Sequence, residues 1–172
     1  MLDPLSLILG AINGQLLYHA GRNSEAIEQF KVTLGMEPRF WVGQICAAKV
    51  YEKVGMYSEA LSACDRAWDF SGGNTEALSI AGYVHAVAGD RAKAEARIEQ
   101  MLDLKNKRYV PPYNIALVFA GLRDTETALQ WLEQAFADRD VHMPFLLDHK
   151  WNVISRTPQF RELLSRVGFP SL

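Results

Sequence analysis

The hexapeptide GRNSEA at residues 21–26 marks a turn that recurs along the chain. GMYSEA follows at 55–60 and GDRAKA at 89–94, so a glycine, and an alanine five residues after it, return every 34 residues. One further step reaches RDTETA at 123–128, which keeps the alanine and has Arg123 in place of the glycine. A period of this length indicates stacked supersecondary units. The sequence predicts four units, at 7–40, 41–74, 75–108 and 109–142.

Other positions of the unit also keep a residue type. Small residues return at the eighth place, which holds Gly14, Ala48, Gly82 and Ala116. Small side chains let two helices approach closely, and the recurring glycine can end the first helix of a unit in a left-handed conformation. Hydrophobic periodicity and capping residues then predict eight repeat helices. These lie at about 5–19, 23–35, 40–53, 57–70, 75–87, 91–104, 112–121 and 125–137.

Two departures from the pattern leave alternatives open. In the fourth unit, either Gly121 ends the helix two residues early or the turn is strained at Arg123. The proline that closes the first unit is replaced by Gly72 and Asn106 in the next two. Both residue types can still adopt a left-handed conformation, so we expect these turns to survive.

The two ends of the chain differ. Residues 143–172 are typical of a capping segment, with a short helical bridge followed by a helix that Thr157-Pro158 begins and Gly168 ends. Residues 1–6 match the tail of a preceding repeat, so we expect a fragment or internal-start product of a longer array. The first helix would then present an uncovered apolar face, which includes Leu5, Leu9 and Ile12. Such a face predicts a homo-oligomer through the N-terminal helix.

The 34-residue period and its small, aromatic and alanine positions resemble the tetratricopeptide repeat family over residues 7–142. The resemblance implies an all-α fold, a right-handed superhelix of about four helix–turn–helix units with a C-terminal capping helix. The last repeat and residues 157–168 are similar to the C-terminal repeat regions of large bacterial signalling proteins. Those regions follow winged-helix, cyclase or kinase domains, so the resemblance suggests a context and supplies no activity. A cytoplasmic location is expected because residues 1–4 have an acid and a proline where a secretory signal has basic residues.

The family lines a concave groove with the first helix of each unit, and the resemblance implies the groove residues of this chain. They are Gln15, Tyr18, His19, Lys49, Lys53, Tyr83 and Tyr113. An aromatic groove with two central lysines suits a peptide or protein segment that carries an acidic group. For each residue the alternative is packing within the superhelix. Ala11 and Ser79 stand where chaperone-binding members need lysines, so binding of chaperone tails is not expected.

The predicted function is therefore a protein–protein interaction scaffold that catalyses no reaction. The alternative is a regulatory or sensor module of a larger signalling protein, a winged-helix regulator, a cyclase or a kinase, whose other domains are absent. An enzyme in its own right would need a convergent polar pocket, and the sequence contains no nucleotide-binding, zinc-protease or serine-hydrolase motif. No cofactor is expected.

Composition and isolated residues exclude further classes. With 18 Lys and Arg against 20 Asp and Glu, the net charge of −2 indicates neither nucleic acid nor a membrane surface as a partner. The basic run at 105–109 is interpreted as a solvated loop. Cys46 and Cys64 are expected to remain free thiols, although a pairing stays open. No metal site is expected, because the acids and histidines between 138 and 149 lack a known ligand spacing.

Overall fold

The computed structural model describes residues 4–170, with side chains from Leu7 onward, and all regular structure in that range is helical. Its elements are α1 (Pro4–His19), α2 (Asn23–Met36), α3 (Trp41–Lys53), α4 (Tyr57–Ser71), α5 (Thr75–Val87), α6 (Arg91–Lys105), α7 (Pro112–Gly121), α8 (Thr125–Ala137), η1 (Met143–Phe145), η2 (His149–Trp151) and α9 (Pro158–Val167). The bounds of α1 to α8 lie within one residue of the prediction, so the all-α fold is confirmed. None of these helices has the length and apolar run needed to cross a bilayer.

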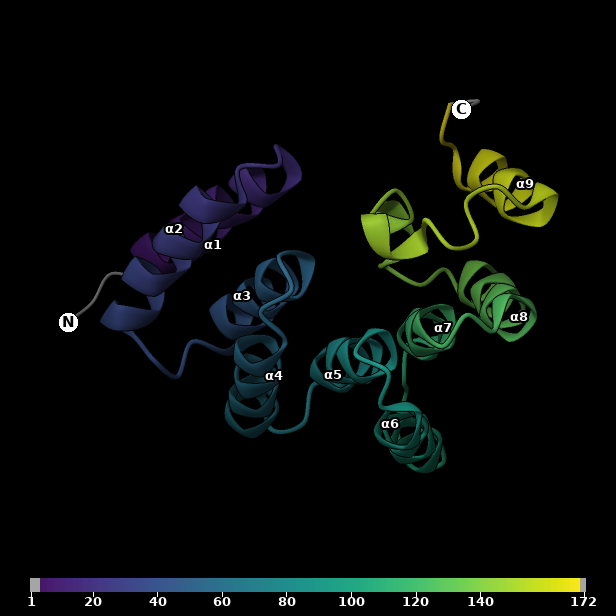
Figure 1. Ribbon diagram of the computed structural model, residues 1–172, viewed down its shortest axis with the longest axis horizontal. Helices are drawn as coiled ribbons and strands as arrows, with labels where there is room; N and C mark the ends of the chain where they lie inside the picture. The colour runs from purple at the N-terminus through teal and green to yellow at the C-terminus, as the bar shows by residue number, and fades with distance from the viewer. Residues whose placement is uncertain (1–3, 171–172) are drawn as a thin grey trace.

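Consecutive helices pair as hairpins, and the hairpins follow one another along an arc (Figure 1). The first helices of the pairs, α1, α3, α5 and α7, contact their neighbours along the inner side of this arc. Close approach within a pair depends on the small residues at the eighth place. A Cβ atom on Gly14 would lie 2.5 Å from the Phe30 ring of α2, and one on Gly82 would lie 3.2 Å from Cβ of Arg97 on α6. The Cβ atom on Gly82 would also lie 2.7 Å from Val118 on α7 of the next hairpin.

The turn inside each hairpin requires a left-handed residue. Glycine supplies it in the first three hairpins, with φ angles of 75°, 80° and 87° at Gly21, Gly55 and Gly89. In the fourth, Arg123 itself takes a φ of 62°, so the strained alternative is the correct one. Gly121 is the last residue of α7, and its missing side chain leaves room for α5. A Cβ atom there would lie 2.9 Å from Ala86.

The links between hairpins follow the expectation only in part. Gly72 has a φ of 69°, as expected. The turn after α6 survives as expected, but Asn106 does not use the left-handed conformation open to it, since its φ is −71°, in the right-handed region. The amides of Lys107 and Arg108 both donate to the carbonyl of Leu104, so the chain leaves α6 through a tightened last turn that needs no left-handed residue.

The C-terminal end of the array is covered and the N-terminal end is bare. Helix α9 begins at a Thr157 cap, ends at Gly168 with a φ of 103°, and packs on α8 through buried Phe160 and Leu163. At the other end, the α1 residues Ile8, Leu9, Ile12 and Leu16 are exposed. The side chain of Leu5, and most of the predicted repeat remnant at 1–6, lie outside the described residues. The division of the chain into four units and a cap stays a prediction.

Candidate functional site

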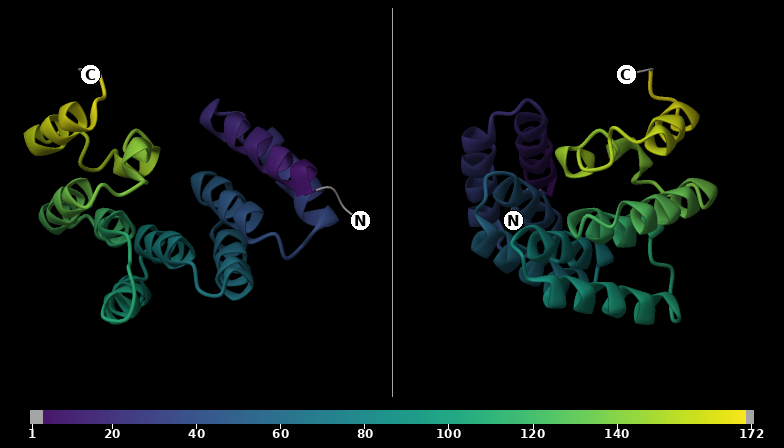
Figure 2. Two further views of the ribbon diagram at one scale, coloured as in Figure 1. Left: turned by 180° about the vertical axis from the view of Figure 1, so that it is seen from behind. Right: turned by 45° about the vertical axis from the view of Figure 1, so that its right-hand side comes forward.

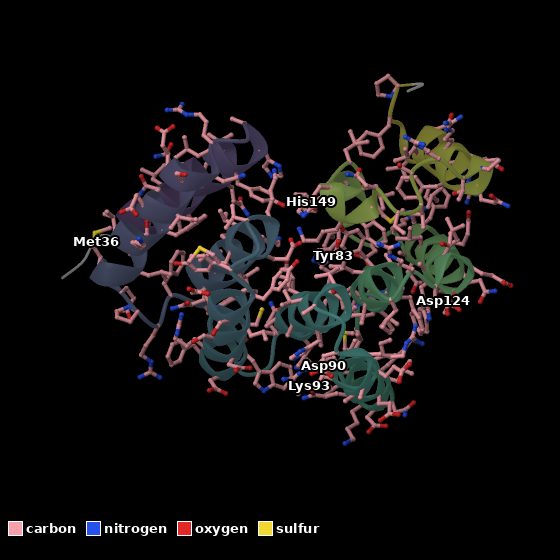
Figure 3. The ribbon with its side chains drawn as sticks, viewed as in Figure 1. Met36, Tyr83, Asp90, Lys93, Asp124 and His149 are labelled. Carbon is pink, nitrogen blue, oxygen red and sulfur yellow. The ribbon has the colours of Figure 1, made fainter. Side chains whose placement is uncertain are left out.

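The seven predicted groove residues all lie on the inner helices of the arc. Figure 3 shows Tyr83 at the centre of this inner side, whereas Met36 and Asp124 lie at its outer edge. One cavity of about 40 Å³ is lined by several of the predicted residues, namely Gln15, Tyr18, His19, Lys49 and Tyr113. Because a water molecule needs about 10–15 Å³ of such space, the cavity has room for a few waters and none for a peptide. Lys53 and Tyr83 do not line it.

The groove is small because residues 140–151, called here the closing segment, lie along the inner side of the arc (Figure 2). The segment is anchored to the fourth hairpin by apolar contacts, since Leu146 and Trp151 are buried in one core with Tyr83 and Tyr113. The indole Nε1 of Trp151 donates to the Tyr113 hydroxyl at 2.9 Å. The backbone amide of Tyr113 donates to Asp140 at 3.1 Å, which places a carboxylate at the N-terminus of α7.

The same segment reaches across to α1 through polar groups. The Tyr18 hydroxyl donates to Oδ2 of Asp148 at 2.7 Å and accepts from Nζ of Lys150 at 3.1 Å. Burial raises the pKa of Asp148, but bonds from His149 and the charge of Lys150 outweigh burial and hold that pKa below its ordinary value. Burial, reinforced by Asp148, raises the pKa of Tyr18. The Asp148 carboxylate and the Tyr18 phenol are therefore charged and neutral respectively.

A second group of polar contacts joins the closing segment to α3. Glu52 is buried, and its Oε2 lies 3.1 Å from Nε2 of His149 and 3.3 Å from Nζ of Lys150. Despite these ion pairs, the geometry gives that oxygen no directed hydrogen bond. Burial lowers the pKa of His149, but Asp148 and Glu52 outweigh burial and raise the pKa above its ordinary value.

Both groove lysines already have partners. Nζ of Lys49 lies 2.6 Å from Oε1 of Glu76 and 5.6 Å from the centre of the Phe145 ring. Burial lowers the pKa of Lys49, yet the Glu76 carboxylate more than offsets it, so the net change is upward. Nζ of Lys53 lies 4.4 Å from the centre of the Tyr18 ring. The positive charge of Lys49 is thus balanced by a carboxylate on the same inner face, whereas Lys53 contacts the ring and the backbone carbonyl of Tyr18.

The other predicted residues differ in the contacts that their side chains make. Nε2 of Gln15 lies 3.1 Å from the Cys46 sulfur. His19 is exposed, with its ring edge-on to Tyr18 at 5.0 Å. The hydroxyl of Tyr83 has no hydrogen-bond partner among residues 7–170, and burial followed by the charges of Glu52 and Asp148 raises its pKa.

The acids and histidines after the last repeat, and the two cysteines, were the remaining candidates for a metal site or a disulfide. Asp140 and His142 bond to each other at 2.7 Å, and the part of the chain that the structure describes contains no group of three acids, histidines or cysteines suited to a metal ion. Cys46 and Cys64 are both free and buried. Burial raises the pKa of Cys46 to about 11.

Glu52 and Glu76 fall on inward places of the repeat, so the resemblance already implies that they face the groove. Sequence reasoning missed the residues after the last repeat that contact this face and close the groove. Asp148, His149 and Lys150 lie after the last repeat, where no periodic position fixes which way they face. Their role follows only from the path of the closing segment back along the arc.

Comparison with known proteins agrees with this architecture. The sequence matches no protein-family model and no curated protein. Solved structures do match. A tetratricopeptide repeat protein from Thermus thermophilus has a TM-score of 0.61 at 23% identity, over 94% of this chain and 83% of its own.

Two further structures align over nearly the whole chain. A tetratricopeptide repeat protein from Parabacteroides merdae has a TM-score of 0.57 at 14% identity, over 96% of this chain. A chain of the APC/C hetero-tetramer Cut9–Hcn1 has a TM-score of 0.64 at 18% identity, over 93% of this chain. The present chain spans 65% of the first of these proteins and 32% of the second. The fold of this chain is that of the tetratricopeptide repeat proteins.

Proposed function

We propose that the chain is a protein-interaction scaffold that catalyses no reaction. Its binding surface is the inner groove of Gln15, Tyr18, His19, Lys49, Lys53, Tyr83 and Tyr113. One observation carries this proposal: a peptide segment, the chain's own residues 140–151, already lies against that surface and bonds to Tyr18 and Tyr113. The groove therefore offers side chains that can hold a polypeptide.

The experiment compares the parent chain with a groove variant, Lys53→Ala with Tyr83→Phe. These changes remove a charge and an unpartnered hydroxyl and leave the hydrophobic contacts of the ring in place. The matched control is Lys31→Ala with Tyr109→Phe, because Lys31 and Tyr109 are exposed outside the groove. Segments selected from a displayed peptide library on the parent chain are then titrated against all three proteins.

Binding in the groove predicts that the control keeps the parent affinity and that the groove variant loses at least about tenfold, as expected when anchoring contacts are removed. Equal affinity for all three proteins would place the ligand elsewhere and contradict the proposal. An acidic residue among the selected segments would support the predicted acidic group, and Lys53 would bind it, because Lys49 is already paired with Glu76.

A second proposal concerns the bare face of α1, which we infer pairs with a second copy of the chain. Leu9, Ile12 and Leu16 are exposed, whereas the residues one repeat later are buried against the preceding hairpin. Those later residues are Gly43, Cys46 and Val50. The described end face of α8 is covered by α9, so head-to-tail stacking has no free partner face. Two-fold pairing of α1 with α1 remains.

The sequence of α1 favours such pairing, because Pro4–His19 contains no Asp, Glu, Lys or Arg. Two copies can therefore meet without burying an unpaired charge. Light scattering is expected to show a mass that rises with concentration for the parent chain. Leu9→Glu with Leu16→Glu should give the monomer mass throughout. A parent mass that stays at the monomer value would contradict the proposal.

We also propose that the array belongs to a bacterial, cytoplasmic signalling protein. There it would present the groove to another domain of the same polypeptide. The discriminating observation is whether the selected segments match a neighbouring domain or a separate protein.

A further inference from the structure

We propose that the groove recognises a segment with the chemistry of the chain's own Phe145–Lys150, and that this segment binds by displacing those residues from α1 and α3. The recognised pattern is an aromatic residue, an acidic residue three places later and a basic residue two places after the acid. This inference rests on the proposed function, since it names the ligand of the same groove.

Four side chains of the closing segment contact the N-terminal half of the arc. His149 lies beside Glu52 and Tyr18, and the other three each meet a different kind of group. The Phe145 ring lies 5.6 Å from Nζ of Lys49, a cation–π distance. Asp148 accepts from the Tyr18 hydroxyl at 2.7 Å. Nζ of Lys150 lies 3.3 Å from the Glu52 carboxylate. The groove therefore reads a ring, an acid and a base in that order.

The closing segment is attached unequally to the two halves of the arc. Toward the fourth hairpin it buries the apolar side chains Leu146 and Trp151. Toward α1 and α3 it contributes charged groups and Phe145, a ring that remains exposed over much of its surface. Opening on that second side would rehydrate charges and would uncover little apolar surface, so the cost of opening is small compared with that of unfolding a hairpin.

The groove cannot hold both its own segment and another. The cavity beside the segment measures about 40 Å³, and Phe145, Asp148 and Lys150 are among the residues that line it. Figure 3 shows His149 on the inner side of the arc, between the α1–α2 pair and the C-terminal helices. A ligand that contacts Tyr18 and Glu52 must therefore take the place of these side chains.

The contact with Glu52 also indicates how a competing segment can bind more tightly than the native one. Oε2 of Glu52 has ion pairs and no directed hydrogen bond. A guanidinium group offers two parallel N–H donors that match a carboxylate, which a single ammonium group cannot do. We therefore expect arginine to be preferred over lysine at the basic place of the ligand.

The test uses a chain whose own segment is released by Phe145→Ala with Asp148→Asn. Asparagine can still cap η2, so the local turn is retained. The matched control is Leu147→Ala with Val153→Ala, two exposed residues that make none of the three contacts. The probe is a fluorescent peptide of residues 142–152, with versions carrying Phe145→Ala, Asp148→Asn or Lys150→Arg, and binding is followed by anisotropy.

The native peptide should bind the released chain at least about tenfold more tightly than it binds the parent or the control. The Phe145→Ala and Asp148→Asn peptides should lose that affinity, and the Lys150→Arg peptide should gain severalfold. A native peptide that binds the released chain no better than the parent, while circular dichroism shows intact helices, would overturn the inference.

Two outcomes separate this inference from the proposed function. Selected segments that depend on Lys53 and Tyr83 but lack the aromatic–acid–base pattern would retain the scaffold and overturn the inference alone. Should the released chain lose its helices, the peptides are titrated into the parent chain. There the Lys150→Arg peptide should still bind most tightly, and equal affinities would overturn the inference.

Discussion

The two ends of the helical array differ in the burial of their apolar residues. At the C-terminal end, Phe160 and Leu163 of α9 are buried against the last hairpin. At the N-terminal end, Leu9 and Leu16 of α1 are 63% and 64% exposed. Both sets follow helical spacing, and the first-repeat residues are equivalent to core residues of later repeats. An apolar position in a repeat therefore becomes core only where a neighbouring element covers it.

The two ends also meet, and they do so through polar groups. Tyr18 of α1 and Glu52 of α3 contact Asp148 and Lys150 of the closing segment. Apolar packing continues from α3 and α4 into α5, whereas the contacts of the closing segment with α1 and α3 that close the groove are mainly polar. Because buried ion pairs add little net stability but depend strongly on geometry, we expect closure to be more easily perturbed than either half.

The largest effect on stability is expected from a substitution in the covered C-terminal end. Phe160→Ala removes a fully buried ring and should lower the free energy of unfolding by about 3–5 kcal/mol. The matched substitution at the bare end, Leu16→Ala, should change it by no more than about 0.5 kcal/mol. Urea denaturation at low protein concentration measures both. Similar losses for the two variants would mean that α1 is covered in solution, as in the proposed dimer.

A smaller effect is expected where the two ends meet. Glu52→Gln leaves His149 and Lys150 without one carboxylate, and a rigid site would lose about 3–5 kcal/mol. We expect a loss of about 1–2 kcal/mol instead, because the halves can separate and let water reach the cations. Urea denaturation measures the loss.

Opening itself is measured by spin labels on Ser24→Cys and Asn152→Cys. The native thiols are buried, so the introduced ones react selectively. The distance between the labels should lengthen in Glu52→Gln and stay constant in Glu28→Gln, whose side chain is exposed. A large loss of stability at an unchanged distance would show that closure is rigid.

The contrast between the ends explains how much could be predicted from the sequence. The 34-residue period and the capping residues predicted the helices because both can be recognised in the sequence itself. For the fourth turn, the sequence left Gly121 and Arg123 as alternatives. The turn forms at Arg123, the periodic position, as it does at Gly21, Gly55 and Gly89. Gly121 is small for another reason, because a Cβ atom there would lie 2.9 Å from Ala86 of a neighbouring hairpin. The sequence does not show that contact between hairpins.

The candidate site was predictable to a similar extent. The periodic positions gave the residues of the inner face, such as Tyr18 and Lys49, because every repeat orients them in the same way. The residues that engage them, Asp148 and Lys150, lie in a nonrepeating segment. Their pairing with Tyr18 joins residues 130 and 132 positions apart in the sequence, and no local rule fixes such a contact.

Closure, the contact of the closing segment with α1 and α3, should depend on pH. The effect of pH on the spin-label distance should be smaller than that of Glu52→Gln. The pKa of His149 is raised in the closed form above its ordinary value of 6.5, so its contribution is fully present below that value and is lost as the pH rises through the raised pKa. The lowered pKa of Asp148 acts in the opposite sense, with a contribution present above 3.8 and lost in stronger acid. Closure should therefore be strongest in weak acid.

The groups that face His149 are Asp148 and Lys150 of its own segment, Glu52 of α3 and Tyr18 of α1. Raising the pH from about 5 to about 9 should lengthen the spin-label distance in the parent chain. His149→Gln should remove most of that change. A pH profile that persists unchanged in His149→Gln would assign the titration to another group.

The smallest effect concerns the hairpin turns, in which the fourth hairpin differs from the first three. Arg123 has a φ of 62°, a conformation that costs an ordinary residue about 1–2 kcal/mol. Arg123→Gly relieves this strain and adds flexibility to the unfolded chain. We therefore expect the free energy of unfolding, measured by urea denaturation, to rise by about 0.5–1 kcal/mol.

The reverse change, Gly89→Ala, places a side chain at a φ of 87° with no atom within 4 Å of it, and should lower the free energy of unfolding by a similar amount. Because Arg123 is exposed and no atom lies within 4 Å of a Cβ at Gly89, opposite signs would indicate backbone strain. A loss of stability in Arg123→Gly would mean that the arginine side chain stabilises the last hairpin in a way that offsets its strained backbone.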